Sequence, residues 1–328
     1  MLKYLVMTAI LLVPAVARAE YPARAITLVV PFGPGAVQDA TARVLARGLS
    51  KHLGQSVVVE NRRSAYGVPT VRTFKDANPD GYTLLHGHDG QFGFMGSVFD
   101  DHNERLGRQK HDLGYDPARD FTPLGTFAEY RWLLTANKSL GVSDVASLRA
   151  YAESHPKLAM GSVGPSPTLI AALLKKEMGL SELVVPKFGT DGEAMLDMLA
   201  GRTHLFAAST ATVLEQGDAI AYLGAVGAHR NDLFPSLQTL AEQGLTALGT
   251  VPDTWTGLFC PLRCPADVVA ALKEALAKTA ADPEIVGQLK KMGVGVHYRP
   301  AEAVPALIKE TYRVHKELLR QTGVWIIE

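Results

Sequence analysis

The sequence predicts an α/β protein of two lobes, each with a mixed sheet flanked by helices, joined by two strands that cross between the lobes. Three observations support this fold class. Strand-like runs alternate with helical segments in residues 25–85, the alternation restarts after residue 143, and an apolar run near residue 255 leads back to a helical C-terminal part. Such alternation is typical of sheets with crossover helices.

The first lobe begins with three predicted strands and two helices. The apolar runs Ala25–Pro31, Ser56–Glu60 and Tyr82–Leu85 have the length of strands. Between them, helices are predicted at Asp39–Leu53 and Val68–Asp76. The order strand, helix, strand, helix, strand predicts a parallel sheet.

A polar segment follows, from Gly96 to Tyr115. It is rich in charged and amide side chains between Asp100 and Asp112. Such a segment is typical of an exposed loop, so we expect a loop here, with His102 and His111 in solvent.

The extended run Phe121–Ala136 is expected to cross into the second lobe. Strands are predicted there at Lys157–Gly161, Leu183–Pro186, Thr203–Ala208 and Ala219–Val226. Together with the helices described next, they predict a second α/β lobe of the same style.

Three helix starts in the second lobe are indicated by residues that cap helices. Ser143 begins a helix that runs to Glu153. Ser166, followed by Pro167, begins another that ends near Met178. Thr190, with Glu193 three residues later, forms a capping box for a helix that ends at Ala200-Gly201.

The chain is expected to return through Trp255–Pro261 and to finish with helices at Pro265–Ala280, Pro283–Met292 and Pro300–Thr322. Two crossings make a hinge, and a cleft between lobes is a natural ligand site. The sequence thus divides into a leader at 1–19, lobe one at 20–127 plus 251–328, and lobe two at 128–250.

The first residues have the pattern of a cleaved signal peptide. Lys3 precedes the short apolar segment Leu5–Val16, and Ala17-Arg18-Ala19 fits the small-x-small cleavage motif. Export would remove Lys3 and Arg18 and no acid, which changes 33 basic and 33 acidic residues into 31 and 33, a net charge of −2. A near-neutral chain is unlike a nucleic-acid-binding protein, so we expect no nucleic-acid partner.

Cys260 and Cys264 are the two cysteines of the chain. An exported protein meets an oxidising compartment, and the intervening Pro261-Leu262-Arg263 offers a turn, but bridge geometry is strict. The sequence leaves both the disulfide and the free thiols open. We expect no zinc site here, because the two cysteines would supply only two ligands and no second pair of ligands lies nearby in the sequence.

Ligands of open α/β sheets bind beyond the carboxyl ends of the strands, and two such loops belong to lobe one. The first is Phe32-Gly33-Pro34-Gly35-Ala36, which leads to Asp39 at a helix start. Its glycines let backbone N–H groups approach a ligand, and a helix N-terminus favours an anion. The second follows the third strand and holds His88 and Asp89.

Two further loops belong to lobe two. Ser162-Val163-Gly164 with Ser166 offers hydroxyl and N–H donors at a helix start, and Lys187-Phe188-Gly189-Thr190 opens another helix. Lys187 either supplies a positive charge or is solvated, and Phe188 either packs on the ligand or fills the core of its own lobe. Ser209, after the strand Thr203–Ala208, is a further candidate. Helix N-termini from both lobes would then bind one carboxylate.

An alternative interpretation of the second loop is a metal site. Alternation along a strand places His86 and His88 on one side, with Asp89 beside them, which would suit a metal-assisted hydrolase. The other interpretation is that His86 packs in the core and only His88 reaches the cleft. No nucleophile-elbow, zincin or Walker motif is present, so we expect no enzyme, no cofactor and no metal.

Several motifs together resemble one family, the solute-binding receptors of tripartite tricarboxylate transporters (the Bug family). They include ITLVVPFGPGAVQDATAR at 26–43, NPDGYTLLHG at 78–87, GSVGPSPT at 161–168, VPKFGTDGEAMLDMLAG at 185–201 and TWTGLFCPLRCP at 254–265. The likeness extends over nearly all of the exported chain.

The resemblance implies a type II periplasmic binding protein that closes on a small organic carboxylate and delivers it to a membrane permease. It implies that the loops at Phe32–Asp39 and Ser162–Ser166 hold a ligand carboxylate, and that those at Gly87–Gly90 and Phe188–Thr190 line the same cleft. We expect a periplasmic monomer. A receptor that presents its ligand to a membrane sensor is the alternative, because it would use the same closed form.

The sequence departs from the family in several places, which together suggest an altered pocket. Ala36 stands where a second glycine is usual, His88 where a threonine or serine is usual, and Arg63-Ser64-Ala65-Tyr66-Gly67 replaces a glycine-rich segment. We hypothesise that His88 and Lys187 add positive character for an acidic ligand.

Overall fold

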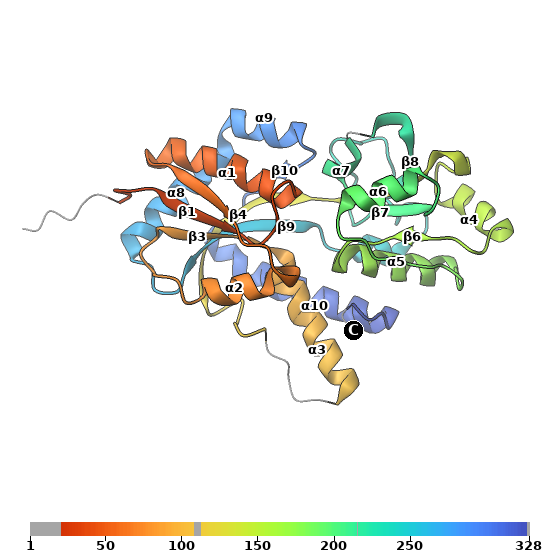
Figure 1. The fold of residues 1–328 in the computed structure, drawn as a ribbon, viewed down its shortest axis with the longest axis horizontal. Helices are drawn as coiled ribbons and strands as arrows, with labels where there is room; N and C mark the ends of the chain where they lie inside the picture. The colour runs from red at the N-terminus through yellow and green to blue at the C-terminus, as the bar shows by residue number, and fades with distance from the viewer. Residues whose placement is uncertain (1–20, 108–112, 215, 327–328) are drawn as a thin grey trace, which may run out of the picture.

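The computed structural model describes residues 21–107, 113–214 and 216–326. The predicted leader at 1–19 and the predicted solvated His111 lie outside these residues. The described chain forms two α/β lobes, seen side by side in Figure 1, each built on its own sheet. Within these residues, no helix combines the length and the apolar character needed to span a bilayer.

Lobe one is built on a six-stranded sheet of order β10-β4-β9-β3-β1-β2. Its strands are β1 (Ile26–Val30), β2 (Val57–Asn61), β3 (Thr83–His88), β4 (Phe121–Tyr130), β9 (Thr254–Pro261) and β10 (Gly295–Val296). Its helices are α1 (Val37–Leu53), α2 (Val68–Phe74), α3 (Met95–Leu106), α8 (Ala266–Ala281), α9 (Pro283–Lys291) and α10 (Val304–Thr322). The predicted parallel pairing is confirmed, because β1 pairs in parallel with both β2 and β3.

Alternation along β1 explains the layers of lobe one. Ile26, Leu28 and Val30 pack under α1, α8 and α9, whereas Val29 packs with α2, α3 and α10 on the opposite face. Successive side chains of a strand point to opposite faces, so an almost wholly apolar strand is buried on both.

Lobe two is built on a four-stranded sheet of order β6-β7-β5-β8. Its elements are β5 (Trp132–Asn137), α4 (Val145–Ser154), β6 (Met160–Gly161), α5 (Pro165–Met178), α6 (Asp191–Leu199), β7 (Leu205–Ser209), α7 (Thr210–Leu214) and β8 (Ile220–Ala225). The predicted strand at Leu183–Pro186 is reduced to isolated bridges to the β6 segment, at Val184 and Lys187.

The two predicted crossings are present as β4–β5 and β9, which run between the lobes in Figure 1. They lie side by side, since β4 pairs antiparallel with β9 as far as Tyr130 opposite Thr254. The limits at residues 127/128 and 250/251 stay a prediction.

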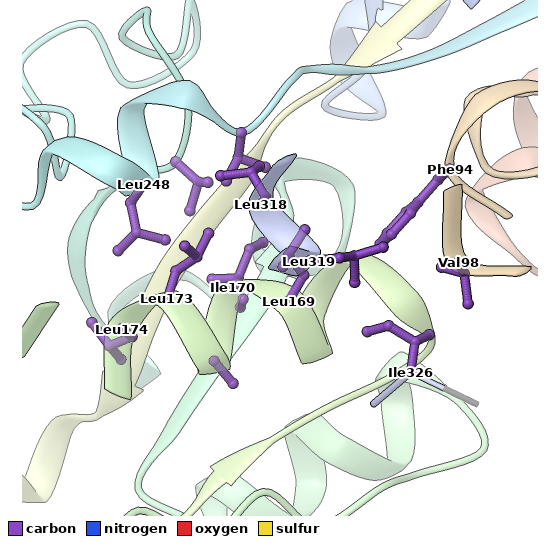
Figure 2. Close-up of a cluster of buried hydrophobic side chains, with 14 of the residues drawn as sticks. Phe94, Val98, Leu169, Ile170, Leu173, Leu174, Leu248, Leu318, Leu319 and Ile326 are labelled. Carbon is purple, nitrogen blue, oxygen red and sulfur yellow. The ribbon is translucent and has the colours of Figure 1, made fainter. Parts of the chain in front are cut away.

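A second connection joins the lobes through helix α10. Leu318 and Leu319 of α10 belong to the same buried cluster as Leu169, Ile170 and Leu173 of α5 (Figure 2). The C-terminal helix therefore joins the hydrophobic core of lobe one to that of lobe two.

The predicted exposed loop at 96–115 is wrong over its first half. Residues Met95–Leu106 form helix α3, in which Asp101 and Asn103 are buried. Charged side chains of α3 form ion pairs. Arg105 Nε lies 2.9 Å from Asp101 Oδ2, and Glu104 Oε1 accepts from Lys316 Nζ of α10 at 2.6 Å. A partner more than two hundred residues away gives no local signal, which is why the helix was missed.

Two helix starts in lobe two also differ from the prediction. Helix α5 begins at Pro165, with Gly164 rather than Ser166 as the N-cap residue. Helix α4 is capped by Asp144, in a capping box with Ser147, rather than by Ser143. The capping box of Thr190 and Glu193 on α6 is confirmed.

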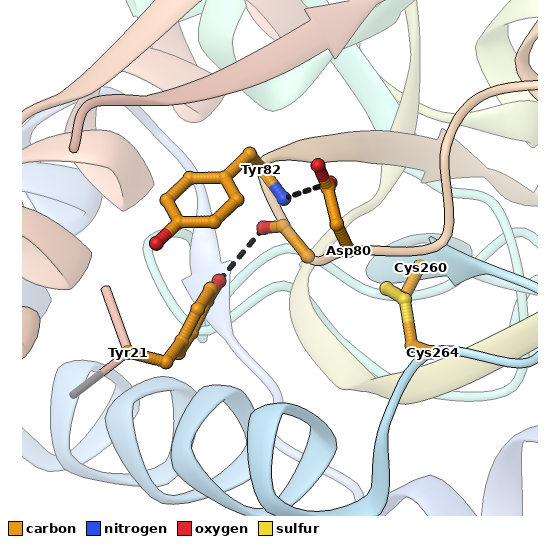
Figure 3. The surroundings of a disulfide bond; sticks show 6 residues. Tyr21, Asp80, Tyr82, Cys260 and Cys264 are labelled. Atoms are coloured by element: carbon orange, nitrogen blue, oxygen red, sulfur yellow. Dashed lines mark hydrogen bonds between the residues drawn. A yellow bond between two sulfur atoms is a disulfide. The ribbon is translucent and has the colours of Figure 1, made fainter. Parts of the chain in front are cut away.

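Cys260 and Cys264 form a disulfide at the end of β9, with their Cα atoms 6.6 Å apart. Figure 3 shows it near Tyr21, whose hydroxyl donates to the Gly81 carbonyl at 2.7 Å. The bridge therefore closes the end of β9 opposite the hinge.

We expect the double variant Cys260→Ala with Cys264→Ala to lose about 2 kcal/mol of unfolding free energy, since the bridge closes a short loop. Denaturant unfolding under oxidising conditions would measure this loss. Coincident unfolding of the variant and the parent chain would contradict it.

Candidate functional site

A cleft of about 890 Å³ lies between the lobes, within the size range of small-molecule sites. Loops beyond the carboxyl ends of β1, β2, β3, β6 and β7 line it. The predicted residues in its lining are Phe32, Gly33, Pro34, Gly35, Ala36, His88, Val163, Gly164, Ser166, Gly189, Thr190 and Ser209.

The other predicted site residues lie behind the lining or beside it. Asp39, Asp89 and Ser162 are buried, Phe188 packs into the core of lobe two, and Lys187 is exposed outside the lining. Of the two residues expected to add positive character, the structure therefore brings only His88 into the cleft.

Helix α1 points an uncapped N-terminus at the cleft. Its N-cap residue is Ala36, which has no side-chain hydrogen-bond acceptor, and Val37 and Gln38 of its first turn also line the cleft. An N-terminus without a capping side chain leaves N–H groups available to an anion.

Asp39 holds the loop before α1 in place. Its carboxylate accepts from the Gly35 N–H at 3.0 Å, from Arg43 Nε at 3.1 Å and from Asn61 Nδ2 at 2.8 Å. Burial alone would raise the pKa of Asp39, but these hydrogen bonds outweigh it and lower the pKa below its ordinary value. Asp39 thus positions the loop without lining the cleft.

Helix α5 presents a second uncapped N-terminus from lobe two. Its N-cap, Gly164, has φ 77° and no side chain, and Pro165 and Pro167 have no N–H, so Ser166 is the first-turn donor beside them. The Ser162 and Thr168 hydroxyls, 2.7 Å apart, support the turn, and Thr168 donates to the Gly164 carbonyl at 2.8 Å. This chain of hydroxyls explains the burial of Ser162.

Helix α6 differs, because its own side chains satisfy its N-terminus. Glu193 accepts from the N–H groups of Gly189 and Thr190 at 3.0 and 3.2 Å, and Thr190 accepts from Glu193 N at 3.2 Å. Asp191, which also lines the cleft, adds an acid there. The loop at 187–190 is therefore part of the wall, with fewer donors than the sequence suggested.

His88 lies in a row of rings on the wall of lobe one. Its ring contacts Phe32 edge-on at 5.4 Å and stacks on Tyr130 at 5.8 Å between centroids. Its Nδ1 atom is 2.8 Å from Asp89 Oδ1 and 3.0 Å from the Gly90 nitrogen. These neighbours hold the imidazole, and its Nε2 atom is buried away from solvent without a hydrogen-bond partner among the described residues.

The proposed metal ligands do not converge. His86 is fully buried, and burial lowers its pKa to about 3, so it packs as a neutral core residue. Within residues 21–107, 113–214 and 216–326, no group of three or more His, Cys, Asp or Glu side chains is arranged to hold a metal ion. The described residues therefore offer no set of metal ligands that the hydrolase interpretation would need.

Sequence reasoning missed lining residues that follow β2. Arg63 and Tyr66 line the cleft, and Arg63 Cδ lies 3.5 Å from the point where a Cβ on Gly33 would stand. Among the described residues Arg63 has no ionic partner. The departure from a glycine-rich segment at Arg63–Gly67 was the available signal.

Comparisons with known proteins agree on one family. The profile described as "Tripartite tricarboxylate transporter family receptor" matches residues 41–324. A UPF0065 protein of Agrobacterium vitis is 30% identical over 94% of this chain and 86% of its own length.

Two solved structures are similar over nearly the whole chain. Rpa4515 of R. palustris, solved with adipate, is 28% identical with a TM-score of 0.80, and the match covers 93% of this chain and 99% of that one. MatC from Rhodopseudomonas palustris, with bound malate, is 26% identical with a TM-score of 0.75, covering 91% and 100%.

The variant Asp39→Asn should lower the unfolding free energy by about 2 kcal/mol near neutral pH, because charge-assisted hydrogen bonds are lost. A lowered folded-state pKa stabilises the fold above the unfolded pKa, and this contribution disappears as the pH falls through the folded value. The difference between parent and variant should thus be constant from about pH 5 to 8 and shrink below about pH 4. Denaturant titrations across this range would test it, and a difference independent of pH would contradict it.

Proposed function

This chain belongs to the tripartite tricarboxylate transporter receptor family, and we propose from this membership that its cleft captures a small organic carboxylate for delivery to a transporter of that type. The resemblance seen in the sequence is thereby confirmed at the level of the family. Solved relatives hold adipate and malate, which supports a small carboxylate as the ligand class.

The observation that carries the proposal is the pair of uncapped helix N-termini in one cleft. Helix α1 comes from lobe one and α5 from lobe two, and neither has a side chain that accepts from its first turn. A carboxylate that contacts the N-termini of both helices would gain about 0.3–2 kcal/mol from each helix dipole. Each hydrogen bond to the charged group adds about 1.5–3 kcal/mol.

Arg63 supplies a full charge beside the α1 loop. Its side chain lies beside Gly33, and in our proposal it pairs with the carboxylate of a ligand at the α1 N-terminus. Ser166 supports the same ligand from lobe two through its hydroxyl and N–H groups. Residues from both lobes then share one charge, so binding favours the closed form.

We further propose a periplasmic protein, exported by the leader at 1–19, that acts as a non-enzymatic monomer and docks on membrane permease subunits. A membrane sensor as the receiving partner would use the same closed form. The four loops predicted from the sequence remain the proposed binding loops, without Lys187 and Phe188 of the fourth loop and with Arg63 added.

A calorimetric titration with carboxylates and their neutral amides tests the charge requirement. We expect binding of at least one carboxylate and none of its amide, because the helix termini and Arg63 stabilise an anion. A ligand at a hundred times its dissociation constant should also stabilise the fold by about 2.7 kcal/mol in thermal unfolding. Equal affinity for acid and amide would refute the proposal.

The variant Arg63→Gln should weaken carboxylate binding about fivefold to tenfold at low salt and reduce its salt dependence, as expected when one solvent-exposed charge pair is lost. Lys187→Gln, outside the cleft lining, is the matched control and should bind like the parent. A larger loss for Lys187→Gln than for Arg63→Gln would contradict the assignment.

A further inference from the structure

The cleft exposes large apolar side chains on both of its walls. Phe32 and Tyr66 of lobe one and Trp132 and Leu196 of lobe two line it, and each is at least partly exposed. Tyr66 is 42% exposed and Leu196 is 66% exposed, so a ligand could cover surface that the protein itself leaves in water. Covering apolar surface is favourable in proportion to its area.

We propose that the ligand is a carboxylate with an aromatic body, and that Tyr66 is the specificity-determining residue that contacts its ring. The inference rests on the proposed function, because it concerns the body of the ligand whose carboxylate binds α1 and α5. It goes further by naming the chemical class.

The backbone of Tyr66 is the second observation. Tyr66 has φ 51° and ψ 14°, the left-handed region that side chains other than glycine rarely adopt. A glycine would adopt this conformation without the steric cost. A strained residue in a cleft is a reason to look for a functional use of its side chain.

Buried neighbours hold Tyr66 in this conformation. The Tyr66 carbonyl accepts from Gln91 Nε2 at 3.1 Å, and the Gln91 carbonyl accepts from the Tyr115 hydroxyl at 2.8 Å. Gln91 is 1% exposed and Tyr115 is 5% exposed, so both belong to the rigid core of lobe one. The ring at the cleft is thereby attached to a fixed backbone, which limits the entropy lost on binding.

The charges of the cleft favour one anionic end over two. Among the described lining residues, Arg63 lies beside the α1 loop, and the other residues with ordinarily charged side chains are Lys291 and Asp191, of opposite sign. Lys291 of α9 and Asp191 of α6 together add no net charge to the lining, so a second carboxylate gains no charge from this pair. Rings such as Phe32 and Trp132 instead suit stacked or edge-on contacts with an aromatic body.

The test is a calorimetric comparison of benzoate, phenylacetate, cyclohexanecarboxylate, adipate and malate on the parent chain and on Tyr66→Gly. We expect an aromatic acid to bind the parent at least about tenfold more tightly than adipate or malate, and more tightly than cyclohexanecarboxylate. In Tyr66→Gly this affinity should fall about tenfold, a change of about 1.4 kcal/mol.

The same variant provides its own folding control. Its melting temperature should be unchanged or higher, because glycine removes the left-handed strain. Tyr298→Ala, a change at another exposed tyrosine that lies outside the lining, should bind like the parent. Loss of binding with a stable fold would support contact with the Tyr66 ring.

Three outcomes would overturn the inference. Tighter binding of adipate or malate than of every aromatic acid would refute it and leave the proposed function intact. Unchanged aromatic affinity in Tyr66→Gly would remove Tyr66 as the determinant. Failure of every carboxylate to bind would overturn the proposed function as well.

Discussion

The arrangement of the cleft depends on two chain crossings that run side by side. A single residue, Arg131, separates β4 from β5, and its Nε donates to Asp253 Oδ2 at 3.1 Å, just before β9. The Arg131 carbonyl also accepts from the Thr210 N–H at 3.1 Å, at the start of α7. The Arg131 side chain therefore joins the two crossings to each other, and the Arg131 carbonyl ties the first crossing to lobe two. Because the crossings are paired, loops from two separate sheets can meet around one ligand.

Whether a helix N-terminus at the cleft can bind an anion depends on whether a side chain already caps it. Helix α6 satisfies its first N–H groups with Thr190 and Glu193, so its terminus contributes to the wall. Helices α1 and α5 begin after Ala36 and Gly164, neither of which has a side chain that can accept a hydrogen bond, so their N-termini are left for an anion. The buried Asp39 fixes the loop that precedes α1, because its carboxylate accepts a hydrogen bond from the Gly35 N–H.

Periodicity and capping chemistry predicted the alternating strands and helices, the parallel strands of lobe one, the two crossings and the loops that line the cleft. The single elements follow from patterns of neighbouring residues, as in the capping box at Thr190 or the apolar run at Ala25–Pro31, and the sheet and the crossings follow from the order of these elements. Helix α3 was missed because its polar residues are paired with α10, whose side chains lie far away in the sequence. Arg63 and Tyr66 were missed as site residues for a similar reason, since only the folded chain places them beside Gly33 and Gln91.

The sequence by itself determined the fold class, the family and the candidate binding loops, because each depends on local motifs in a particular order. Tertiary structure alone decided which of these loops present unsatisfied donors to the cleft. It buried His86 and left Lys187 outside the lining, which no spacing of residues could reveal. It also placed Cys260 and Cys264 close enough to form a disulfide, which the sequence had left open. The physical reason is that exposure, hydrogen-bond satisfaction and charge pairing are set by segments that meet only in the folded molecule.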